Sequence, residues 1–400
     1  MPRENKKETL SNSNNKTIVL QLIRSGVEIT RADIIEKSGL SAPTVTRIIE
    51  DLLERQLIVQ DEVGSSKGGR PPQIIRFEAK RNYVIGVDIS GDYVRAALSN
   101  LDGEFSYEIH LPVNIEGEFD GVMLQVGELI QKLEHRAQTK QYRLFGIGIA
   151  ICGLVSKQTG LLRYSPVFDW KDKDILKALK SYSDLPMEME NVSHLIALGE
   201  SLYGVGREYD SMINVNLDYG IGSGIIINGQ PFYGSQGFAG ELGHIVLDSE
   251  SKRKGKENIS GTFEAVASGY ALTDIARERL AKVKNSALSK ISPSMLDAKA
   301  IIHAAEEGDK LAGEIVNTLA DYTGISLDIL IKLFNPDAIT LSGGLIDHGN
   351  LLLNKVKEKV QSISLPIYES ETPIVPSTFG EEAALMGAFS LILQKILKLE

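Results

Sequence analysis

The chain has 400 residues, 42% of them hydrophobic and 24% charged, which is the composition of a globular protein with two or three domains. A single cysteine, Cys152, excludes an internal disulfide and a cysteine-rich zinc site, and it is typical of a reducing compartment. No apolar run approaches the roughly 18 residues that span a bilayer, and residues 1–13 lack the apolar core of a signal peptide. We therefore expect a cytoplasmic protein with no membrane contact.

The net charge of −10 argues against a protein coated in nucleic acid, but the charge is unevenly distributed. Residues 1–80 contain 13 Lys and Arg against 11 Asp and Glu, a net charge of +2, so the remaining residues carry −12. A weakly basic head on an acidic body is typical of a small DNA-binding domain joined to a ligand-binding domain.

The head has the sequence pattern of a winged helix-turn-helix. Its polar residues 1–13 are predicted to form a disordered tail, and an apolar stripe predicts a first helix over residues 15–24. Thr30 is expected to cap a second helix, which Gly39 ends in a turn, and Ser41 is expected to cap a third. The apolar positions of this third helix recur at i, i+3, i+4 and i+7, and they are Val45, Ile48, Ile49 and Leu52.

The start of the third helix is where a recognition helix presents side chains to base edges. Two strands are predicted near residues 57–59 and 73–77, and the glycine-rich segment 64–72 between them would form a wing near phosphates or the minor groove. The predicted DNA-binding residues are Ser41, Pro43, Thr44, Thr46, Arg47, Lys67 and Arg70. The alternative is a three-helix domain with a flexible linker that binds no DNA.

From Tyr83 onward, predicted strands alternate with helices, which indicates an α/β fold. Three glycine-rich turns follow predicted strands, as they do where actin-like ATPases hold the phosphates of a nucleotide. The turns are residues 90–92, 218–224 and 342–344. A single turn of this kind is weak evidence, and three in this order are considerably stronger.

The segment Gly240-Glu241-Leu242-Gly243-His244 matches the Glu-x-Gly-His signature of the ROK family (repressor, open reading frame, kinase). Glu264, in Thr262-Phe263-Glu264, matches a second family glutamate. The resemblance covers about residues 14–400, and the layout is similar to that of the family's xylose and N-acetylglucosamine repressors. It implies a winged helix-turn-helix followed by an actin-like (RNase H-like) sugar-kinase fold, with two subdomains around a sugar cleft.

The resemblance also implies domain boundaries. A DNA-binding domain is expected at residues 14–78, after the tail. The first subdomain is expected at 79–197, completed by a C-terminal helix at 378–400, and the second subdomain, with the sugar cleft, at 198–377.

By the same resemblance, amide, carboxylate and imidazole groups line the sugar cleft, where they suit directional hydrogen bonds to sugar hydroxyls. The expected sugar-binding residues are Asn191, Glu241, His244 and Glu264. The alternative is that these side chains only satisfy nearby backbone groups.

Three substitutions argue against kinase chemistry. Val192 stands where kinases of this family have the catalytic aspartate, and the loss of a general base typically costs ~10²–10⁴-fold in rate. Asp92 and Asp218 stand in two phosphate turns, where the family has a threonine and a small residue, and their carboxylates would repel a triphosphate. We therefore expect no catalytic residue and no cofactor.

Other differences between this chain and the family concern metal binding and sugar binding. Many family members bind zinc through the equivalent of His244 and nearby cysteines, but residues 254–262 contain none, so we expect no metal. The basic run 252–256 is interpreted as a solvated loop, with contact to a ligand phosphate as the alternative. Val167 and Phe168 replace a family Asn-Leu pair, which leaves the identity of the sugar open.

The sequence thus predicts a non-enzymatic transcriptional regulator, a repressor of carbohydrate-utilisation genes. It would bind a palindromic operator as a homodimer or tetramer and respond to a sugar or sugar derivative. The alternatives are an ATP-dependent sugar kinase that carries a DNA-binding domain, and a regulator controlled by a partner protein.

Overall fold

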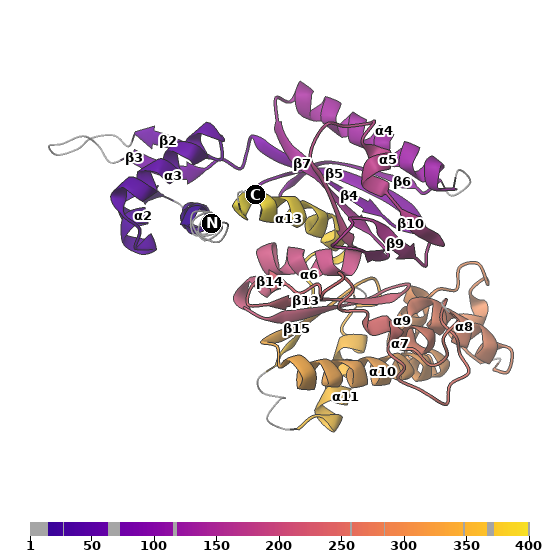
Figure 1. The fold of residues 1–400 in the computed structure, drawn as a ribbon. Helices are drawn as coiled ribbons and strands as arrows, with labels where there is room; N and C mark the ends of the chain where they lie inside the picture. The colour runs from indigo at the N-terminus through magenta and orange to yellow at the C-terminus, as the bar shows by residue number, and fades with distance from the viewer. Residues whose placement is uncertain are drawn as a thin grey trace.

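The computed structural model describes residues 15–398 except residues 27, 63–72, 115–117, 257, 284, 347–348 and 366–371. These residues form a small N-terminal head and a body of two lobes, each built on a five-stranded sheet (Figure 1). None of the helices within the described ranges is long and apolar enough to cross a membrane.

The head follows the order of a winged helix-turn-helix. After a helix over residues 15–25, its elements are β1 (Ile29–Thr30), α2 (Arg31–Ser38), α3 (Ala42–Glu54), β2 (Ile58–Glu62) and β3 (Gln73–Phe77). The strands form one antiparallel sheet in the order β1-β3-β2. As predicted, Thr30 caps α2, in a reciprocal capping box with Asp33, and Gly39 ends the helix with a left-handed φ of 67°.

The predicted inner face of α3 is confirmed, because all four of its apolar positions are buried. Ser41 is the N-cap residue of this helix, as predicted, but its side chain makes no capping hydrogen bond: its Oγ lies 2.8 Å from Thr44 Oγ1 and contacts no helix amide. Pro43 at the second helical position has no N–H, which removes one of the two amides that such a cap uses, and the Thr44 hydroxyl takes the contact instead.

The first lobe contains a mixed sheet in the order β11-β7-β4-β5-β6. Its strands are β4 (Asn82–Ile89), β5 (Tyr93–Asn100), β6 (Phe105–Pro112), β7 (Arg143–Ile151) and β11 (Met187–Asn191). Helices α4 (Glu118–Thr139) and α5 (Ile175–Leu179) pack on this sheet. A small sheet follows β7 and consists of β8 (Leu154–Val155), β9 (Leu162–Ser165) and β10 (Trp170–Lys173).

The second lobe has its sheet in the order β14-β13-β12-β15-β16. Its strands are β12 (Met212–Leu217), β13 (Ile221–Ile227), β14 (Gln230–Pro231), β15 (Ala338–Ser342) and β16 (Ile374–Pro376). Its helices are η2 (Val205–Glu208), η3 (Leu242–His244), α7 (Phe263–Ala267), α8 (Gly269–Leu280), η4 (Ala287–Lys290), α9 (Ala298–Glu306), α10 (Lys310–Phe334) and α11 (Leu351–Ile363). One large apolar cluster joins the sheet to all of these helices except η2.

Two helices, α6 (Val192–Tyr203) and α13 (Ala383–Lys398), lie between the sheets (Figure 1). Helix α13 packs on β4 and β7, as predicted for the C-terminal helix, whereas α6 packs on β12 and β13. The two helices cross closely, since a Cβ on Gly387 would lie only 2.3 Å from Leu195 O. The C-terminal helix begins at Ala383, after the 3₁₀ turn η5 (Gly380–Glu382), and not at residue 378 as expected from the sequence.

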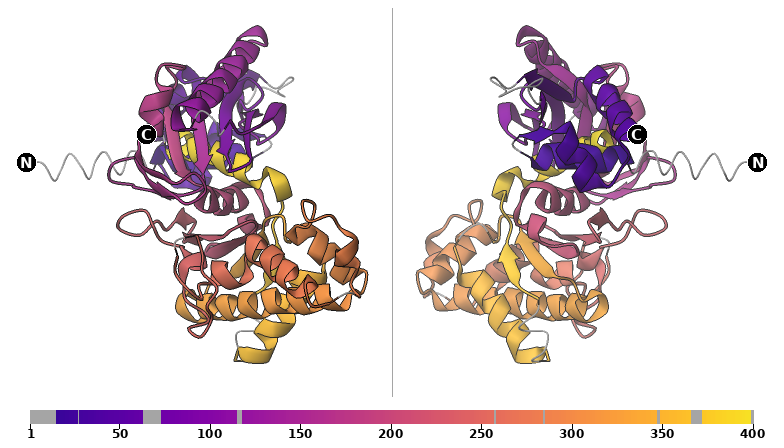
Figure 2. Two further views of the ribbon diagram at one scale, coloured as in Figure 1. Left: turned by 90° about the vertical axis from the view of Figure 1, so that its right-hand side faces the viewer. Right: turned by 90° about the vertical axis from the view of Figure 1, so that its left-hand side faces the viewer.

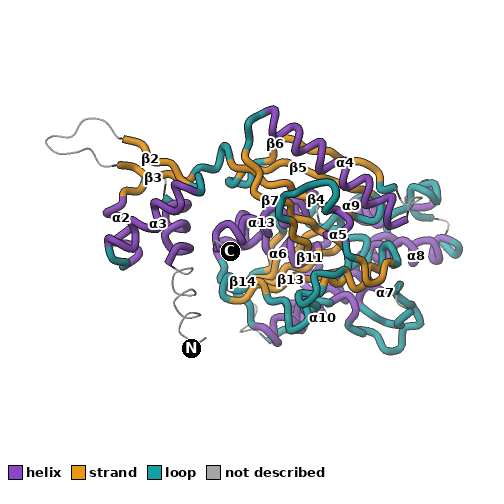
Figure 3. The backbone as a smooth tube through the Cα atoms, turned by 45° about the horizontal axis from the view of Figure 1, so that its top comes forward, coloured by secondary structure: helices purple, strands orange, loops and turns teal. Residues whose placement is uncertain are grey.

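The head packs on the first lobe, away from the helices at the far end of the second lobe (Figure 2). A short connection leads from β3 to β4 (Figure 3). Head residues and Phe389 of α13 belong to one buried apolar cluster. The Arg24 guanidinium lies 4.7 Å from the ring centre of Tyr203, and Asn82 Nδ2 donates to Gln56 O at 2.8 Å. The head is therefore in contact with the end of α6 and in the same core as α13.

Candidate functional site

Asn191 ends β11 and is the N-cap residue of α6. Its Oδ1 accepts a hydrogen bond from Ser193 N at 2.8 Å, and its Nδ2 donates to Gly153 O at 2.8 Å. Both bonds go to backbone groups, as the local-backbone alternative expects. An amide can make four hydrogen bonds, however, so among the described residues one lone pair and one N–H are left for a ligand.

The glutamate of α7 lies beside the first residues of β13. Glu264 is almost fully buried, and its Oε2 accepts a hydrogen bond from Ile221 N at 2.9 Å. A Cβ on Gly220 would lie 2.7 Å from this same oxygen. The absence of a side chain at Gly220 therefore lets the carboxylate reach the turn before β13.

The signature segment lies against the same strand. Ser223 donates to Gly240 O through its Oγ at 2.7 Å and its N at 3.2 Å. Gly240 has a φ of +89°, and a Cβ there would lie 2.5 Å from Ser223 O, so glycine is required. In the half-exposed pair that follows, Glu241 Oε2 lies 3.4 Å from His244 Nε2.

The end of β7 and the start of α6 complete this region. A Cβ on Gly222 would lie 2.1 Å from Ser193 Oγ, so the first turn of α6 lies directly on β13. Burial raises the pKa of Cys152 at the end of β7 to about 12, and the negative charges of Glu264 and Glu241 act in the same direction. The structure thus brings the four predicted sugar-binding residues to one region between the lobes.

Position 192 offers no proton acceptor. The half-buried Val192 packs against an apolar cluster of β7, α6 and α13. The buried members of that cluster are Ala150, Leu195, Leu198, Ala384, Ala388 and Leu391.

The glycine-rich turns hold carboxylates. Asp218 Oδ1 accepts from Tyr219 N at 2.8 Å, and its Oδ2 accepts from Gly344 N at 3.4 Å. Backbone amides of such turns commonly bind phosphates, and here a side chain of the protein takes two of them. In the first turn, Asp92 accepts from Ser90 Oγ at 3.2 Å.

Asp88, which precedes the first turn, is 3% exposed, and its Oδ2 has no hydrogen-bond partner within the described residues. Burial raises the pKa of Asp88 to about 7, because the positive charge of Arg95 only partly offsets the cost of removing a carboxylate from water. The carboxylates of Asp92 and Asp218 raise it further. Asp88 is therefore uncharged or about half-charged at neutral pH.

The candidate DNA-binding residues of α3 line its first turns. Ser41, Pro43 and Arg47 are exposed, and Thr44 and Thr46 are half-buried. Arg31 Nη1 donates to Thr46 Oγ1 at 3.4 Å, which joins α2 to α3 at this surface. The two candidates of the wing, Lys67 and Arg70, lie outside the described residues.

Comparison with known proteins identifies the body. The profile of the ROK family matches residues 84–395, which is more than half of the chain. The chain belongs to the ROK family. The xylose repressor of Bacillus subtilis (strain 168) is 27% identical over 96% of each chain. The DNA-binding transcriptional dual regulator NagC of Escherichia coli (strain K12) is 28% identical over 96% of this chain and 93% of its own.

ROK kinases are also similar, but over a shorter range. The glucokinase of Thermotoga maritima is 28% identical over 78% of this chain and 98% of its own. A crystal structure of a ROK family transcriptional regulator, a homologue of the E. coli MLC protein, has a TM-score of 0.87, 27% identity and 97% coverage of both chains. The Streptomyces griseus ROK glucokinase with glucose and AMPPNP has a TM-score of 0.70, 26% identity, and coverage of 78% and 99%. The predicted fold is confirmed.

The zinc site of other ROK proteins does not fit this ROK chain. Lys254 Nζ donates to Asn258 Oδ1 at 2.8 Å in the loop where thiolates are missing, and Arg253 forms an ion pair with Glu278 of α8. No three His, Cys, Asp or Glu side chains within the described ranges are grouped as metal ligands. An open depression of about 560 Å³ beside this loop is lined by none of the four candidate sugar residues.

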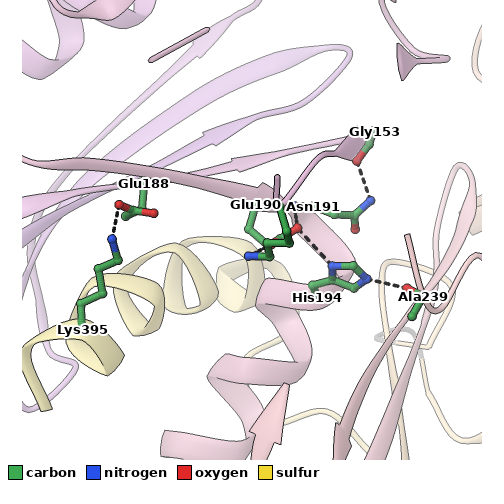
Figure 4. A network of polar contacts seen from close by, with 8 residues as sticks. Gly153, Glu188, Glu190, Asn191, His194, Ala239 and Lys395 are labelled. Carbon is green, nitrogen blue, oxygen red and sulfur yellow. Dashed lines mark hydrogen bonds and ion pairs between the residues drawn. The ribbon is translucent and has the colours of Figure 1, made fainter. Parts of the chain in front are cut away.

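A buried charged network that the sequence did not predict lies next to Asn191 in this ROK body. Glu190 and His194 are both buried and in contact with each other (Figure 4), and Lys157 forms an ion pair with Glu190. The four-residue spacing of Glu190 and His194 was the only local signal. Lys157 is too far away in the sequence to be paired with them by pattern.

Proposed function

We propose that this ROK protein is a DNA-binding transcriptional regulator, a repressor of carbohydrate-utilisation genes, whose body binds a sugar or sugar derivative without phosphorylating it. One observation carries the proposal. Proteins named as repressors or regulators match 96–97% of the chain, including the head, whereas a glucokinase matches 78%. The valine at position 192 supports the absence of catalysis, because it cannot take a proton from a sugar hydroxyl.

The proposed effector site uses Asn191 on the first-lobe side and Glu241, His244 and Glu264 on the second-lobe side. A sugar that bridges these residues would change the angle between the lobes. Helix α6 is capped by Asn191 and ends at Tyr203, which contacts Arg24 of the head. A lobe movement would therefore reach the head through α6 and α13, with a coupling of roughly 1–3 kcal/mol.

In a homodimer, such a movement changes the spacing of two recognition helices and hence the affinity for a palindromic operator. The relatives are named for xylose and for N-acetylglucosamine, so pentoses, amino sugars and their phosphates are the first effectors to test.

Thermal unfolding in the presence of a panel of pentoses, hexoses, amino sugars and their phosphates, each with and without ATP–Mg²⁺, tests the effector site. A specific effector at 100 times its Kd is expected to stabilise the protein by about 2.7 kcal/mol, to the same extent with and without ATP. Stabilisation by ATP–Mg²⁺ would favour the kinase alternative. No stabilisation by any sugar would favour control by a partner protein.

Replacing Arg47 tests the proposed recognition helix. Arg47→Ala is expected to weaken binding to DNA selected from a random duplex pool about 10–100-fold, because a specific arginine contact is worth roughly 1–3 kcal/mol. Fluorescence anisotropy measures this affinity. The matched control is Arg277→Ala, which changes an exposed arginine of α8 in the second lobe and should leave DNA binding unchanged. If Arg47→Ala abolished sugar stabilisation as well, the assignment of Arg47 to the DNA contact would be wrong.

The kinase alternative has support in the glucokinase relatives and is tested at position 192. Val192→Asp restores a carboxylate, but Asp218 still accepts hydrogen bonds from two turn amides. We therefore expect no sugar-dependent release of ADP from ATP in a coupled assay, either for the natural sequence or for Val192→Asp. Robust turnover of the variant would mean that the nucleotide site is intact.

A further inference from the structure

A buried histidine lies between the lobes with both ring nitrogens facing acceptors. His194 Nε2 lies 2.6 Å from Ala239 O, and its Nδ1 lies 3.1 Å from Glu190 Oε1 (Figure 4). A main-chain carbonyl can only accept, so Nε2 carries a hydrogen. An ionised carboxylate also can only accept, so a hydrogen on Nδ1 is required as well, and the ring is then an imidazolium.

The surroundings of Glu190 favour its ionised form. Its Oε2 forms an ion pair with Lys157, and its Oε1 accepts from Asn191 N at 2.7 Å. Burial acts to raise the pKa of Glu190, but the hydrogen bond from His194 and the charge of Lys157 outweigh it and lower that pKa. A buried carboxylate with a partner on each oxygen stays charged and keeps its partners charged.

Opposing effects also set the pKa of His194. Burial acts to lower the pKa of His194, but the hydrogen bond and the charge of Glu190 outweigh it, with smaller help from Ala239 O and Glu241, and raise it above the ordinary value. The charged or titratable groups that face this ring are Glu190 of β11, Lys157 of the turn after β8, Tyr233 after β14, and Glu241 before η3.

These contacts hold residues 232–241 of the second lobe against the first lobe. Lys157 N donates to Gln236 O at 3.2 Å, and Lys157 Nζ lies 3.7 Å from the ring centre of Tyr233. The His194 ring lies edge-to-face with the same tyrosine ring, with 5.4 Å between ring centres. Residues 232–241 end at Glu241 of the candidate sugar site, and Glu190 is the neighbour of Asn191 in the sequence. The network therefore connects the two sides of the candidate sugar site.

We propose that His194 is a positioning residue, whose imidazolium bridges Glu190 and Ala239 and so fixes residues 232–241, and with them Glu241, relative to Asn191. The role of Glu241 and Asn191 in sugar binding rests on the proposed function, whereas the bridge itself does not. A histidine whose pKa is raised by folding contributes a contact that is complete below the ordinary value of about 6.5 and is lost as the pH rises through the folded value. The segment should therefore loosen as the pH rises through the folded pKa of His194.

Nuclear magnetic resonance of protein labelled with ¹⁵N-histidine tests the charge without any ligand. One of the six histidines is expected to be more than half protonated at pH 6.5, with both ring N–H groups protected from solvent, and its signals should be missing in His194→Gln. The proposal would be overturned if every histidine had its titration midpoint at or below pH 6.5. This measurement on the natural sequence is decisive even if the variant does not fold.

Hydrogen exchange of the sugar-free protein tests the positioning. At pH 6.5, peptides within residues 232–241 are expected to lose protection about tenfold in His194→Gln but not in His303→Gln, which changes an exposed histidine of α9. In the natural sequence, the same protection, corrected for intrinsic exchange, should fall as His194 titrates. Equal protection in both variants, or protection independent of pH, would overturn the proposal. No sugar is present in this experiment. The hydrogen-exchange result therefore does not depend on whether the protein is a sugar-responsive regulator.

Discussion

Phe389→Ala is expected to lower the free energy of unfolding by about 3–5 kcal/mol, because it leaves a cavity in the apolar core that contains residues of the head, the first lobe and α13. Phe389 is fully buried, and its ring centre lies 5.4 Å from that of Tyr203 at the end of α6. Urea unfolding followed by circular dichroism measures the loss. The head should lose protection from hydrogen exchange in the same variant, because the core is shared.

The matched control is Phe334→Ala at the end of α10, where the phenylalanine is 38% exposed. Its expected cost is well below that of Phe389→Ala, since little apolar surface is removed from a core. Equal costs for the two variants would contradict the close packing of α13. A head that kept full protection in Phe389→Ala would contradict a core shared between head and body.

Asp88→Asn is expected to stabilise the protein at pH 8, by at most about 4 kcal/mol. The pKa of Asp88 is about 7 in the folded protein, against 3.8 for the ordinary side chain. The folded state therefore binds a proton that the unfolded state has lost between about pH 4 and pH 7, and stability falls as the pH rises through this range. Asparagine cannot ionise, so the variant escapes this loss.

The stability difference between Asp88→Asn and the natural sequence should grow from pH 4 to pH 7 and then level off. Thermal unfolding in buffers from pH 4 to pH 8.5 follows it. Asp92→Asn in the adjacent turn removes an exposed carboxylate and should show a much smaller change across the same range. A difference for Asp88→Asn that did not depend on pH would mean that Asp88 is ionised at neutral pH.

Local patterns in the sequence predicted the local structure well. The apolar spacing of α3 gave its buried face, and Thr30 and Gly39 marked the ends of α2, because caps and helical periodicity depend on neighbouring residues. Ser41 is the N-cap residue of α3 as predicted, but its hydroxyl contacts Thr44 Oγ1 and no helix amide, and Pro43 has no amide hydrogen to donate.

Long-range contacts were out of reach of such patterns. The charged state of His194 depends on Ala239, 45 residues away, and on Lys157, neither of which has a recognisable spacing to it. The shared core of head and α13 joins residues from opposite ends of the chain, such as Val19 and Phe389. The signature around Glu241 predicted a site, but only the fold places it beside Asn191 through strand β13.

The most direct test of the account is a DNA-binding titration. Duplexes selected by the protein from a random pool are bound at constant protein concentration while each sugar of the panel is added, with and without ATP–Mg²⁺. We predict that one sugar changes the operator Kd about 5–150-fold, to the same extent in both conditions and without ADP release. A sugar that binds tightly yet leaves DNA binding unchanged, or that drives ADP release, would contradict a catalytically inactive, sugar-responsive regulator.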